Sequence, residues 1–592
     1  MPHYKKAICL MLSLALSACQ QDKEVETISD ATMAEMSDVS TLSDQGITDM
    51  IVSDQMMGDL EDMETSGTIV APMIEFCNSE GLLSRPWRTD QGEAIFGQIA
   101  GDFSVETLRG AWTLSEQWSG CEAYVFFVYF PDLRANPSGP WIGDQLWESD
   151  VTDLLNGPAN THYFFLSFEE ESQARQNRMV EMNNRFIRTL NPGEVLPERR
   201  LHFVTDRATE VEGSVGEFLS SYLDFVFDSN SLVDLGDRGS AQAPLPFVFG
   251  IDRLQRWDSG GSLDEVVGRP MKWSMATYLG PFYNYISDTY ERASQDSATE
   301  LSLVSGRTSD RVHIKTIELP QPLEGNEFTS LELDVSVTCP HRNVFACSEW
   351  DRIARVSYCL DPLCEESREM ARWITPYWRR GERRWIWDAS HSLPWLSSES
   401  QASFRIEFGP SWERATERDV EVKLRFHQGA AELELVESLY AFGGGAFDEA
   451  YNSREPFSFT PPQDAEKVEL VILLSGHGQT SQDNCAEWCD HRHLFTINNQ
   501  ALPIISHEGE IGSLDGCASL ASRGVSPGQY GNWAPERAFW CPGLPVDPIR
   551  IDMTEFVTLG VPNLLNYQAV LGEETEPRGG EIALSVFVLS YR

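Results

Sequence analysis

The fold of the C-terminal half is decided by Leu331-Glu332-Leu333-Asp334-Val335-Ser336-Val337. Apolar and polar residues alternate strictly in this stretch, which is typical of a β-strand with one buried and one solvent-exposed face. The same period of two recurs at residues 420–426 and 549–553, and a strand-like run occupies 582–588. We therefore expect antiparallel sheets from about residue 310 onwards.

About 280 residues of this pattern suit two β-sandwich (jelly-roll) domains better than one. Phe442-Gly443-Gly444-Gly445 offers a break between them, because glycine-rich stretches commonly connect domains. We place the first sandwich at residues 310–445 and the second at 446–592.

Residues 70–300 carry a different pattern, in which continuous apolar runs alternate with helical stretches. The runs occupy residues 124–130, 163–168, 201–204 and 247–251. Such runs are typical of strands covered on both faces, and the alternation predicts an α/β domain with a mostly parallel sheet. Met179, Met182 and Phe186 recur at the spacing of a helix face.

The order of these elements resembles the thioredoxin or redoxin fold. The loop after the first buried run is Pro131-Asp132-Leu133-Arg134, without a Cys-x-x-Cys. Thiol exchange needs a thiolate and a resolving partner, so we expect an accessory or recognition module and no redox centre.

The chain has 592 residues, and its 45 basic and 91 acidic side chains give a formal net charge of −46. The length predicts two to four domains. Because the charge repels nucleic acids and no basic patch offsets it, nucleic-acid binding is excluded.

The first nineteen residues predict an export signal. Lys5 and Lys6 precede an apolar run that is too short to span a bilayer, followed by Leu16-Ser17-Ala18-Cys19. The motif of residues 16–19 resembles the lipobox of bacterial lipoproteins. This resemblance implies a signal peptide at residues 1–18, a lipid on Cys19 and a location in the bacterial envelope. It also implies that Gln20 favours the outer membrane. The alternative is a secreted protein in which Cys19 is incidental.

Residues 19–68 predict a disordered acidic tether, in which Lys23 is the only basic residue. Ten cysteines follow, an even number that indicates disulfides in an exported protein. Proximity along the chain suggests five pairs, although the sequence does not fix the connectivity. These pairs are Cys77–Cys121, Cys339–Cys347, Cys359–Cys364, Cys485–Cys489 and Cys517–Cys541.

Several polar and aromatic motifs lie beside these cysteines. They are Cys347-Ser348-Glu349-Trp350-Asp351-Arg352, Ile374-Thr375-Pro376-Tyr377-Trp378, Ser475-Gly476, Cys485-Ala486-Glu487-Trp488-Cys489 and Asn532-Trp533-Ala534-Pro535-Glu536-Arg537-Ala538-Phe539-Trp540-Cys541. In residues and order, this set resembles the peptide-N-glycosidase F family, amidases that release N-linked glycans from asparagine. The resemblance covers residues 310–592.

The resemblance implies that Asp351 is the primary catalytic acid/base and that Glu487 is its partner across the domain interface. It implies binding of the GlcNAc–asparagine unit by Trp350, Arg352, Trp412 and Arg537. The chemistry is consistent, because two neighbouring carboxylates separate their proton affinities, an arginine stabilises developing charge, and indoles suit the faces of sugar rings.

Two departures from the family pattern bear on activity. The family has a third glutamate just before the tryptophan that matches Trp412, but residues 408–412 contain no acid, and Glu407 and Glu413 should point elsewhere. His477 and Gln479 replace a tryptophan and a histidine of the family.

We expect a monomeric hydrolase without a cofactor, acting on N-glycosylated proteins or glycopeptides and held to the membrane by its lipid. The alternative is a catalytically inactive glycan-binding lipoprotein on the same scaffold. A third hypothesis is an envelope redox or metal protein, for which Cys485, Cys489, His491 and His493 could form a zinc tetrad.

Overall fold

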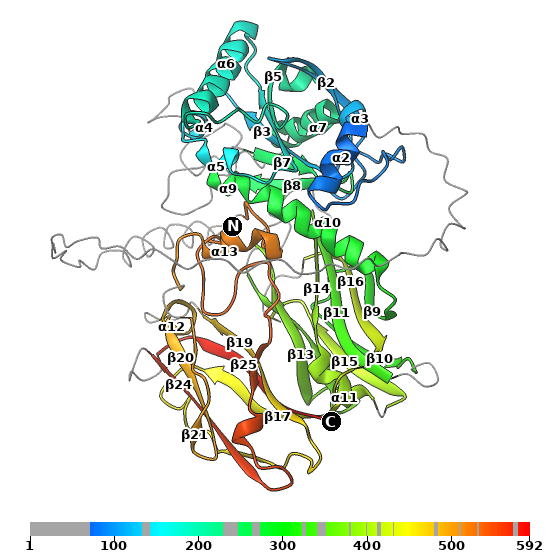
Figure 1. Cartoon of the computed structure of the whole chain (residues 1–592), viewed down its shortest axis with the longest axis vertical. Helices are drawn as coiled ribbons and strands as arrows, with labels where there is room; N and C mark the ends of the chain where they lie inside the picture. Colours follow the sequence, from blue (N-terminus) through cyan, green and yellow to red (C-terminus); the bar gives the residue numbers. More distant parts are fainter. Residues whose placement is uncertain are drawn as a thin grey trace, which may run out of the picture. The chain divides into compact units, whose positions relative to one another are not determined.

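The structure is a computed structural model of the chain (Figure 1). All residues that it describes belong to one compact unit, Thr65–Arg592. They are residues 71–132, 142–228, 247–262, 273–321, 327–339, 351–377, 381–397, 399–410, 416–429, 431–478, 484–507, 511–529, 532–571 and 578–592. Several predictions lie outside them, namely the signal, the tether, Cys19, Cys347, Trp350 and Trp412.

The N-terminal region is built on one eight-stranded sheet with the order β2-β1-β5-β4-β3-β7-β8 and β6 paired to β1. Every residue of the two central strands β3 and β4 is buried, as expected for their continuous apolar sequences. The strands are β1 (Phe103–Thr107), β2 (Gly110–Thr113), β3 (Ala123–Tyr129), β4 (Thr161–Ser167), β5 (Leu201–Arg207), β6 (Glu212–Gly213), β7 (Phe247–Ile251) and β8 (Trp257–Ser262).

This sheet is mixed, and the prediction of a mostly parallel sheet is wrong. Only the pairs β3–β4 and β4–β5 are parallel among the described strands. Strand β7 runs antiparallel to β3, β8 runs antiparallel to β7, and β1 runs antiparallel to β5. A continuous apolar run reports burial on both faces and carries no information about strand direction.

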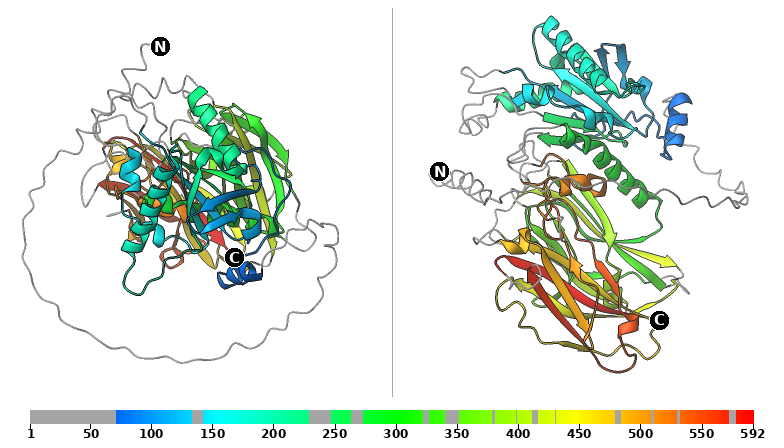
Figure 2. Two further views of the ribbon diagram at one scale, coloured as in Figure 1. Left: turned by 90° about the horizontal axis from the view of Figure 1, so that it is seen from above. Right: turned by 60° about the vertical axis from the view of Figure 1, so that its left-hand side comes forward.

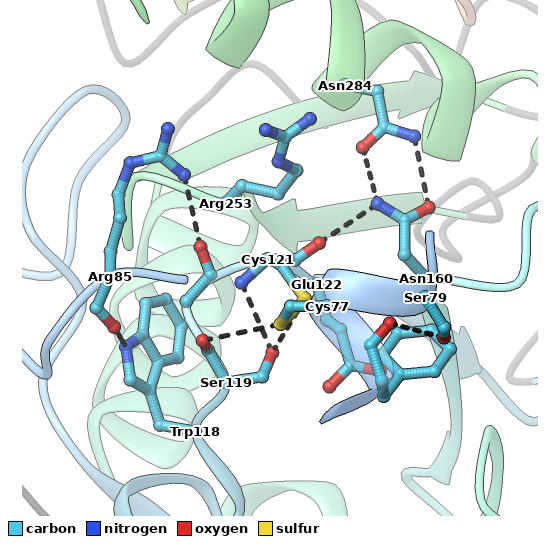
Figure 3. Close-up of a disulfide and its surroundings, with 12 residues drawn as sticks. Cys77, Ser79, Arg85, Trp118, Ser119, Cys121, Glu122, Asn160, Arg253 and Asn284 are labelled. Carbon is cyan, nitrogen blue, oxygen red and sulfur yellow. Dashed lines mark hydrogen bonds between the residues drawn. A yellow bond between two sulfur atoms is a disulfide. The ribbon is translucent and has the colours of Figure 1, made fainter. Parts of the chain in front are cut away.

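The helices of this region bury the faces that the sequence predicts. Helix α6 buries Met179, Met182 and Phe186. The Cys77–Cys121 disulfide links α2 to the residues just before β3 (Figure 3). The described helices are α2 (Ala71–Ser79), α3 (Leu114–Gln117), α4 (Ile142–Trp147), α5 (Thr152–Leu155), α6 (Ser172–Thr189), η1 (Ala208–Glu210), α7 (Ser214–Asp228), α9 (Ser274–Thr277) and α10 (Leu279–Gln295). In the described part of the chain, no helix has both the length and the apolar character that a membrane span requires.

The next region contains two four-stranded antiparallel sheets, β10-β15-β12-β13 and β14-β11-β16-β9. Leu331, Leu333 and Val335 of β11 share one buried core with Val356 and Phe404 of the other sheet, so the predicted alternation is the inner face of a sandwich. The strands are β9 (Thr299–Thr308), β10 (Val312–Glu318), β11 (Glu327–Cys339), β12 (Ile353–Cys359), β13 (Ser367–Ile374), β14 (Gly381–Asp388), β15 (Gln401–Glu407) and β16 (Arg418–Gly429), with η3 (Ser390–Ser392) and α11 (Leu393–Leu396). Strand β9 pairs with β16, so this sandwich begins before residue 310.

The last region contains a four-stranded sheet β17-β25-β19-β23 and a five-stranded sheet β18-β24-β20-β21 with β22 on β20. Leu470 and Val588 of the first sheet share a core with Phe495 and Leu565 of the second. The elements are β17 (Leu435–Ala446), β18 (Phe457–Phe459), β19 (Lys467–His477), α12 (Cys485–Trp488), β20 (His491–Ile497), β21 (Gln500–Ala501), β22 (Ile505–Ser506), α13 (Gly516–Ser519), η4 (Leu520–Arg523), β23 (Ile549–Asp552), η5 (Thr554–Phe556), β24 (Asn563–Leu571) and β25 (Glu581–Tyr591).

Residues 442–445 do not separate the two sandwiches, because they lie inside strand β17. The strand pairs with β25 through bulges between Tyr440 and Phe442 and between Gly443 and Gly445. A Cβ on Gly444 would lie 1.9 Å from the backbone oxygen of Ile582. The glycines therefore permit a close strand–strand approach, and the connection falls between β16 and β17.

The two sandwiches are joined through β19 and β25. Val471 and Phe587 point into the core of the first sandwich. Arg372 of β13 donates to the carbonyl oxygen of Ala583 at 2.6 Å and to Ser475 Oγ at 3.0 Å. This buried polar contact fixes the end of β13 against the end of β19, where the candidate site lies.

Candidate active site

Asp351 lies just before strand β12, at the end of the sheet where β12 begins and its antiparallel neighbour β13 ends. The backbone N–H of Arg352 donates to Thr375 Oγ1 at 2.8 Å, and the Thr375 N–H donates to the Arg352 carbonyl at 2.9 Å. This reciprocal pair brings the residues after β13 beside Asp351. The hydroxyl of Tyr377 donates to Asp351 Oδ2 at 2.8 Å.

Glu487 lies in α12, a single helical turn closed by the Cys485–Cys489 disulfide. The turn packs against β19 at Gly476, where a Cβ would lie 1.6 Å from the Ala486 carbonyl oxygen. This close approach explains why glycine occupies position 476. Glu487 is 5% exposed.

Arg537 joins the two acids. Its Nε donates to Glu487 Oε1 at 3.2 Å, and its Nη2 lies 3.7 Å from Asp351 Oδ2. Nη2 also donates to the hydroxyl of Tyr377 at 3.1 Å. Because one rigid guanidinium contacts both carboxylates, the two acids are held in one polar cluster although they come from different sandwiches.

The guanidinium is fully buried, so its remaining contacts are internal. Nη1 donates to the Pro535 carbonyl at 3.0 Å, and Nη2 donates to the Asn532 carbonyl. The indoles of Trp488 and Trp540 each lie with their ring centroid 4.8 Å from the guanidinium carbon. Arg537 thus neutralises and orients the acids, and it offers no exposed surface for a substrate.

Burial and neighbouring charges give the two acids different proton affinities. Burial raises the pKa of Glu487 to about 7, the Arg537 charge opposes that rise, and the charge of Asp351 adds to it. Burial also raises the pKa of Asp351, but Arg537 and the hydroxyl of Tyr377 oppose the rise. The hydrogen bond from the Tyr377 hydroxyl favours the ionised form of Asp351, whereas the charge of Asp351 favours the protonated form of Glu487.

Residues 511–529 and 532–546, here called the Arg537 segment, span both sandwiches. The Cys517–Cys541 disulfide closes it. Trp540 Nε1 donates to the Gly476 carbonyl at 2.5 Å, and the N–H of Gly543 donates to the Ile374 carbonyl at 2.9 Å. These bonds attach the segment to the ends of β19 and β13.

Gln529 connects the Arg537 segment to Tyr377. Its Oε1 accepts from the Tyr377 N–H at 3.0 Å, and its Nε2 donates to the carbonyls of Ser526 and Pro542, each at 3.0 Å. Tyr377, which orients Asp351, is therefore itself positioned by the segment that carries Arg537.

A chain of buried rings supports the Glu487 turn. His491 Nε2 donates to the Ala486 carbonyl at 2.9 Å, so its Nδ1 accepts from His493 Nε2 at 2.8 Å. His493 Nδ1 in turn accepts from the hydroxyl of Tyr567 at 2.7 Å. Burial lowers the pKa of His491 to about 4, which fits the neutral form that this direction requires.

The same contacts contradict the zinc tetrad. Cys485 and Cys489 are bonded to each other, and the ring nitrogens of His491 and His493 are hydrogen-bonded inside the chain just described. Zinc requires free thiolates and imidazole lone pairs.

Among the described residues, metal-ligand geometry is found at Asp296, Glu332 and His427, whose ligand atoms lie within 4.8 Å of one another. His427 already contacts Glu332 Oε2 at 3.0 Å and Asp296 Oδ1 at 3.3 Å. The Arg425 guanidinium lies 3.3 Å from Asp296 Oδ2. A cation would have to displace this positive charge, so we interpret the group as an ion-pair network.

The structure brings Asp351, Glu487 and Arg537 together in one cluster. The charge of Arg352 also opposes the rise in the pKa of Asp351 that burial causes. Trp350 and Trp412 lie outside the described residues, so their sugar-binding role stays a prediction.

Glu407 and His477, which belong to the two departures from the family pattern, each contact other protein side chains. Glu407 pairs with Arg405 at 2.8 Å and lies 3.7 Å from Arg355 on the neighbouring strand. His477 stacks on Trp540 with ring centroids 4.7 Å apart. Glu407 is thus committed to surface ion pairs on β15 and does not replace the missing third acid.

Four of the five suggested disulfides are present in the structure. The fifth, Cys339–Cys347, involves a residue outside the described ranges. The four are Cys77–Cys121, Cys359–Cys364, Cys485–Cys489 and Cys517–Cys541.

Sequence reasoning missed Tyr377 and Gln529 as site residues. Tyr377 stands in the motif Ile374-Thr375-Pro376-Tyr377-Trp378, which the sequence offers only as part of the family resemblance. Its position after a strand that pairs with the Asp351 strand is the signal that could have identified it.

Comparison with known proteins supports a relationship in the C-terminal half. Residues 447–589 match the family model described as "Peptide-N-glycosidase F, C terminal". Peptide-N(4)-(N-acetyl-beta-D-glucosaminyl)asparagine amidase F of Elizabethkingia miricola is 28% identical over 282 residues, which cover 43% of this chain and 76% of that protein.

Two solved structures are also similar. A crystal structure of a peptide-N(4)-(N-acetyl-beta-D-glucosaminyl) asparagine amidase has 23% identity and a TM-score of 0.40, covering 50% of this chain and 96% of its own. PNGase F, a glycosylasparaginase from Flavobacterium meningosepticum, has 22% identity and a TM-score of 0.38 with the same coverage. The C-terminal half is thus related to peptide-N-glycosidase F at low identity.

Proposed function

We propose that this protein is an amidase that hydrolyses the side-chain amide bond through which asparagine carries the N-linked GlcNAc in glycoproteins or glycopeptides. One observation carries the proposal: a buried guanidinium, Arg537, contacts two carboxylates from different sandwiches, and burial raises the pKa of both, that of Glu487 to about 7. The relationship to an asparagine amidase in the same half of the chain supports it.

In the proposed reaction, Asp351 and Glu487 divide the two proton transfers. Ionised Asp351 takes a proton from water, and the water oxygen forms a bond to Cγ of the substrate asparagine. Protonated Glu487 gives its proton to the departing nitrogen as the bond between Cγ and that nitrogen breaks, and the nitrogen stays on the sugar. The products are an aspartate in the peptide and a glycan with an amino group on its first sugar, so one water is consumed. Each positioned proton transfer typically contributes about 10²–10⁴-fold to the rate.

Tyr377 and Arg537 act on the acids in this scheme. The Tyr377 hydroxyl donates to Asp351 Oδ2 and accepts from Arg537, which fixes the carboxylate orientation. Burial raises the pKa of Tyr377 well above its usual value, so the hydroxyl keeps its proton throughout. Both residues are positioning residues, because their polar atoms point at the acids.

For recognition we propose Trp350, Arg352 and Trp412, which follow from the family resemblance. Flat indoles can cover the apolar faces of the sugar rings while the hydroxyl groups form hydrogen bonds. Arg352 adjoins Asp351 in sequence and would bind the polar atoms nearest the cleaved bond.

The test is to incubate the full-length protein with a denatured N-glycoprotein and to analyse the peptides by mass spectrometry. Release of intact glycan together with conversion of asparagine to aspartate supports the amidase. The inactive alternative, a glycan-binding protein, predicts retention on a glycan column without release. An Arg405→Gln variant, which alters a surface ion pair on β15, is the matched control and should release glycan normally.

We also propose that Cys19 carries a lipid that anchors the protein in a bacterial envelope, on the basis of the motif Leu16-Ser17-Ala18-Cys19. Mass spectrometry of the mature N-terminus tests this directly. A lipidated Cys19 supports the anchor, whereas an unmodified Cys19 within a longer N-terminal peptide contradicts it.

A further inference from the structure

Helix α10 is anchored to the N-terminal sheet along one side. The side-chain amides of Asn284 and Asn160 form a reciprocal pair at 2.8 and 3.1 Å, and Asn160 also donates to the Cys121 carbonyl at 3.0 Å (Figure 3). Arg253, which follows β7, donates to Asp288 at 2.8 Å. Two successive turns of the helix are therefore tied to the α/β region.

The other side of the helix contacts the two sandwiches. Tyr285, the residue after Asn284, donates to the carbonyl of Arg384 in β14 at 3.3 Å. Its ring also covers Gly524, which ends η4 with φ +110°, and a Cβ on Gly524 would lie 2.7 Å from that ring. Figures 1 and 2 show α10 between the N-terminal sheet and the sheets that follow.

The contact continues into the Arg537 segment, which begins with α13 and η4. Part of this segment lies in the hydrophobic core of the α/β region, with Phe282 and Ile286 of α10. The residues concerned are Cys517, Ala518, Ala521, Val525, Trp533 and Ala534. The core of the N-terminal region is therefore completed by the part of the chain that holds the site arginine.

Two short links connect this core to the acids. The N–H of Cys517 donates to the Ala534 carbonyl at 3.0 Å. The neighbouring carbonyls of Asn532 and Pro535 accept from the guanidinium of Arg537. A displacement of α13 and η4 would thus move the acceptors that orient Arg537 between Asp351 and Glu487.

We propose that the α/β region is a structural part of the catalytic site, in which helix α10 braces the Arg537 segment through the contact of Tyr285 with Gly524. This inference rests on the proposed amidase function for its kinetic consequence. It assigns Tyr285 as a positioning residue and replaces the expectation that the N-terminal region is only an accessory module.

The test compares three full-length variants. Tyr285→Ala removes the ring that covers Gly524, whereas Tyr285→Phe keeps the ring and loses the hydroxyl that donates to Arg384. Tyr290→Ala is the matched control, because Tyr290 lies on the same helix and its ring packs against Arg256 and Arg384. We expect Tyr285→Ala to lower kcat by about 10- to 100-fold with KM unchanged, since a small misplacement of catalytic groups has effects of this size. The other two variants should keep the wild-type kcat.

Hydrogen exchange supplies a readout that does not depend on activity. In Tyr285→Ala, amides of residues 516–525 and 532–541 should exchange faster, while those of β19 and β25 stay protected. Wild-type protection of the segment in Tyr285→Ala would overturn the proposal, and so would an unchanged kcat. If the wild-type protein releases no glycan, the amidase proposal fails, and the exchange result still decides whether α10 braces the segment.

Discussion

Replacing Glu487 by glutamine should stabilise the folded protein, and the gain should grow with pH. Glutamine has the shape of a protonated glutamate but cannot ionise. In the folded chain Glu487 is 5% exposed, and its pKa is raised from 4.5 to about 7 mainly by burial. Ionisation of this side chain is therefore unfavourable to folding.

The size and sign follow from linkage. Between pH 4.5 and about 7, folded Glu487 holds its proton while the unfolded chain releases it, so the free energy of unfolding falls as pH rises. At about 1.4 kcal/mol per pKa unit, the shift corresponds to about 3 kcal/mol. The stability difference between Glu487→Gln and wild type should therefore increase by about 3 kcal/mol across this range and level off above pH 7.

The assay is urea-induced unfolding of both proteins, with disulfides intact, at a series of pH values. Glu449→Gln is the control, because Glu449 is an exposed acid of the same sandwich. It shows what the same change from acid to amide does at an exposed site. If the Glu487→Gln difference from wild type stays constant as the pH changes, Glu487 has an ordinary proton affinity, and its role as a proton donor at neutral pH is refuted.

Three further perturbations test the site. Asp351→Asn should lower kcat by about 10²–10⁴-fold with a wild-type circular dichroism spectrum, and undiminished turnover would remove Asp351 from the mechanism. Tyr377→Phe removes a hydrogen bond that lowers the pKa of Asp351, so the acidic limb of the pH–rate profile should move to higher pH; an unmoved limb contradicts that role. Replacing Cys517 and Cys541 together by serine should lower the free energy of unfolding by about 2–5 kcal/mol in denaturation experiments, whereas unchanged stability would show that the disulfide does not hold the segment.

The features that the sequence predicts well are those that depend on the local sequence pattern. The alternation in β11 specifies a strand with one buried face, and the structure places Leu331, Leu333 and Val335 in a sandwich core. The nearby cysteines of residues 485 and 489 form the small loop around Glu487. The period of an alternating sequence and the spacing of two cysteines are read from the sequence alone. Predictions based on them therefore require no knowledge of tertiary contacts.

The features that the sequence does not predict depend on which distant segments meet. Strand β7 joins β3 in antiparallel orientation, and no residue of its apolar run encodes that choice. The glycine-rich sequence around Gly444 predicts a linker, but in the fold the glycine is required by the approach of Ile582 from β25. Likewise, Tyr377 contacts Asp351 because β13 ends beside the residue at which β12 begins.

Within the site, the surroundings of Arg537 are likewise not predictable from the sequence. The family resemblance implies that it holds the substrate, whereas its position in the fold makes it the link between Asp351 and Glu487. Its complete burial follows from the indoles of Trp488 and Trp540 and from internal carbonyl acceptors. A charged residue in a motif does not reveal whether solvent or other protein groups will surround it.

The most direct measurement is hydrolysis of a single defined N-glycopeptide in water labelled with heavy oxygen, followed by mass spectrometry of both products. The account predicts an aspartate that contains one solvent oxygen and an intact glycan with an amino group on its first sugar, and no product with Asp351→Asn. A peptide that still carries asparagine, with or without a remaining sugar, would contradict it.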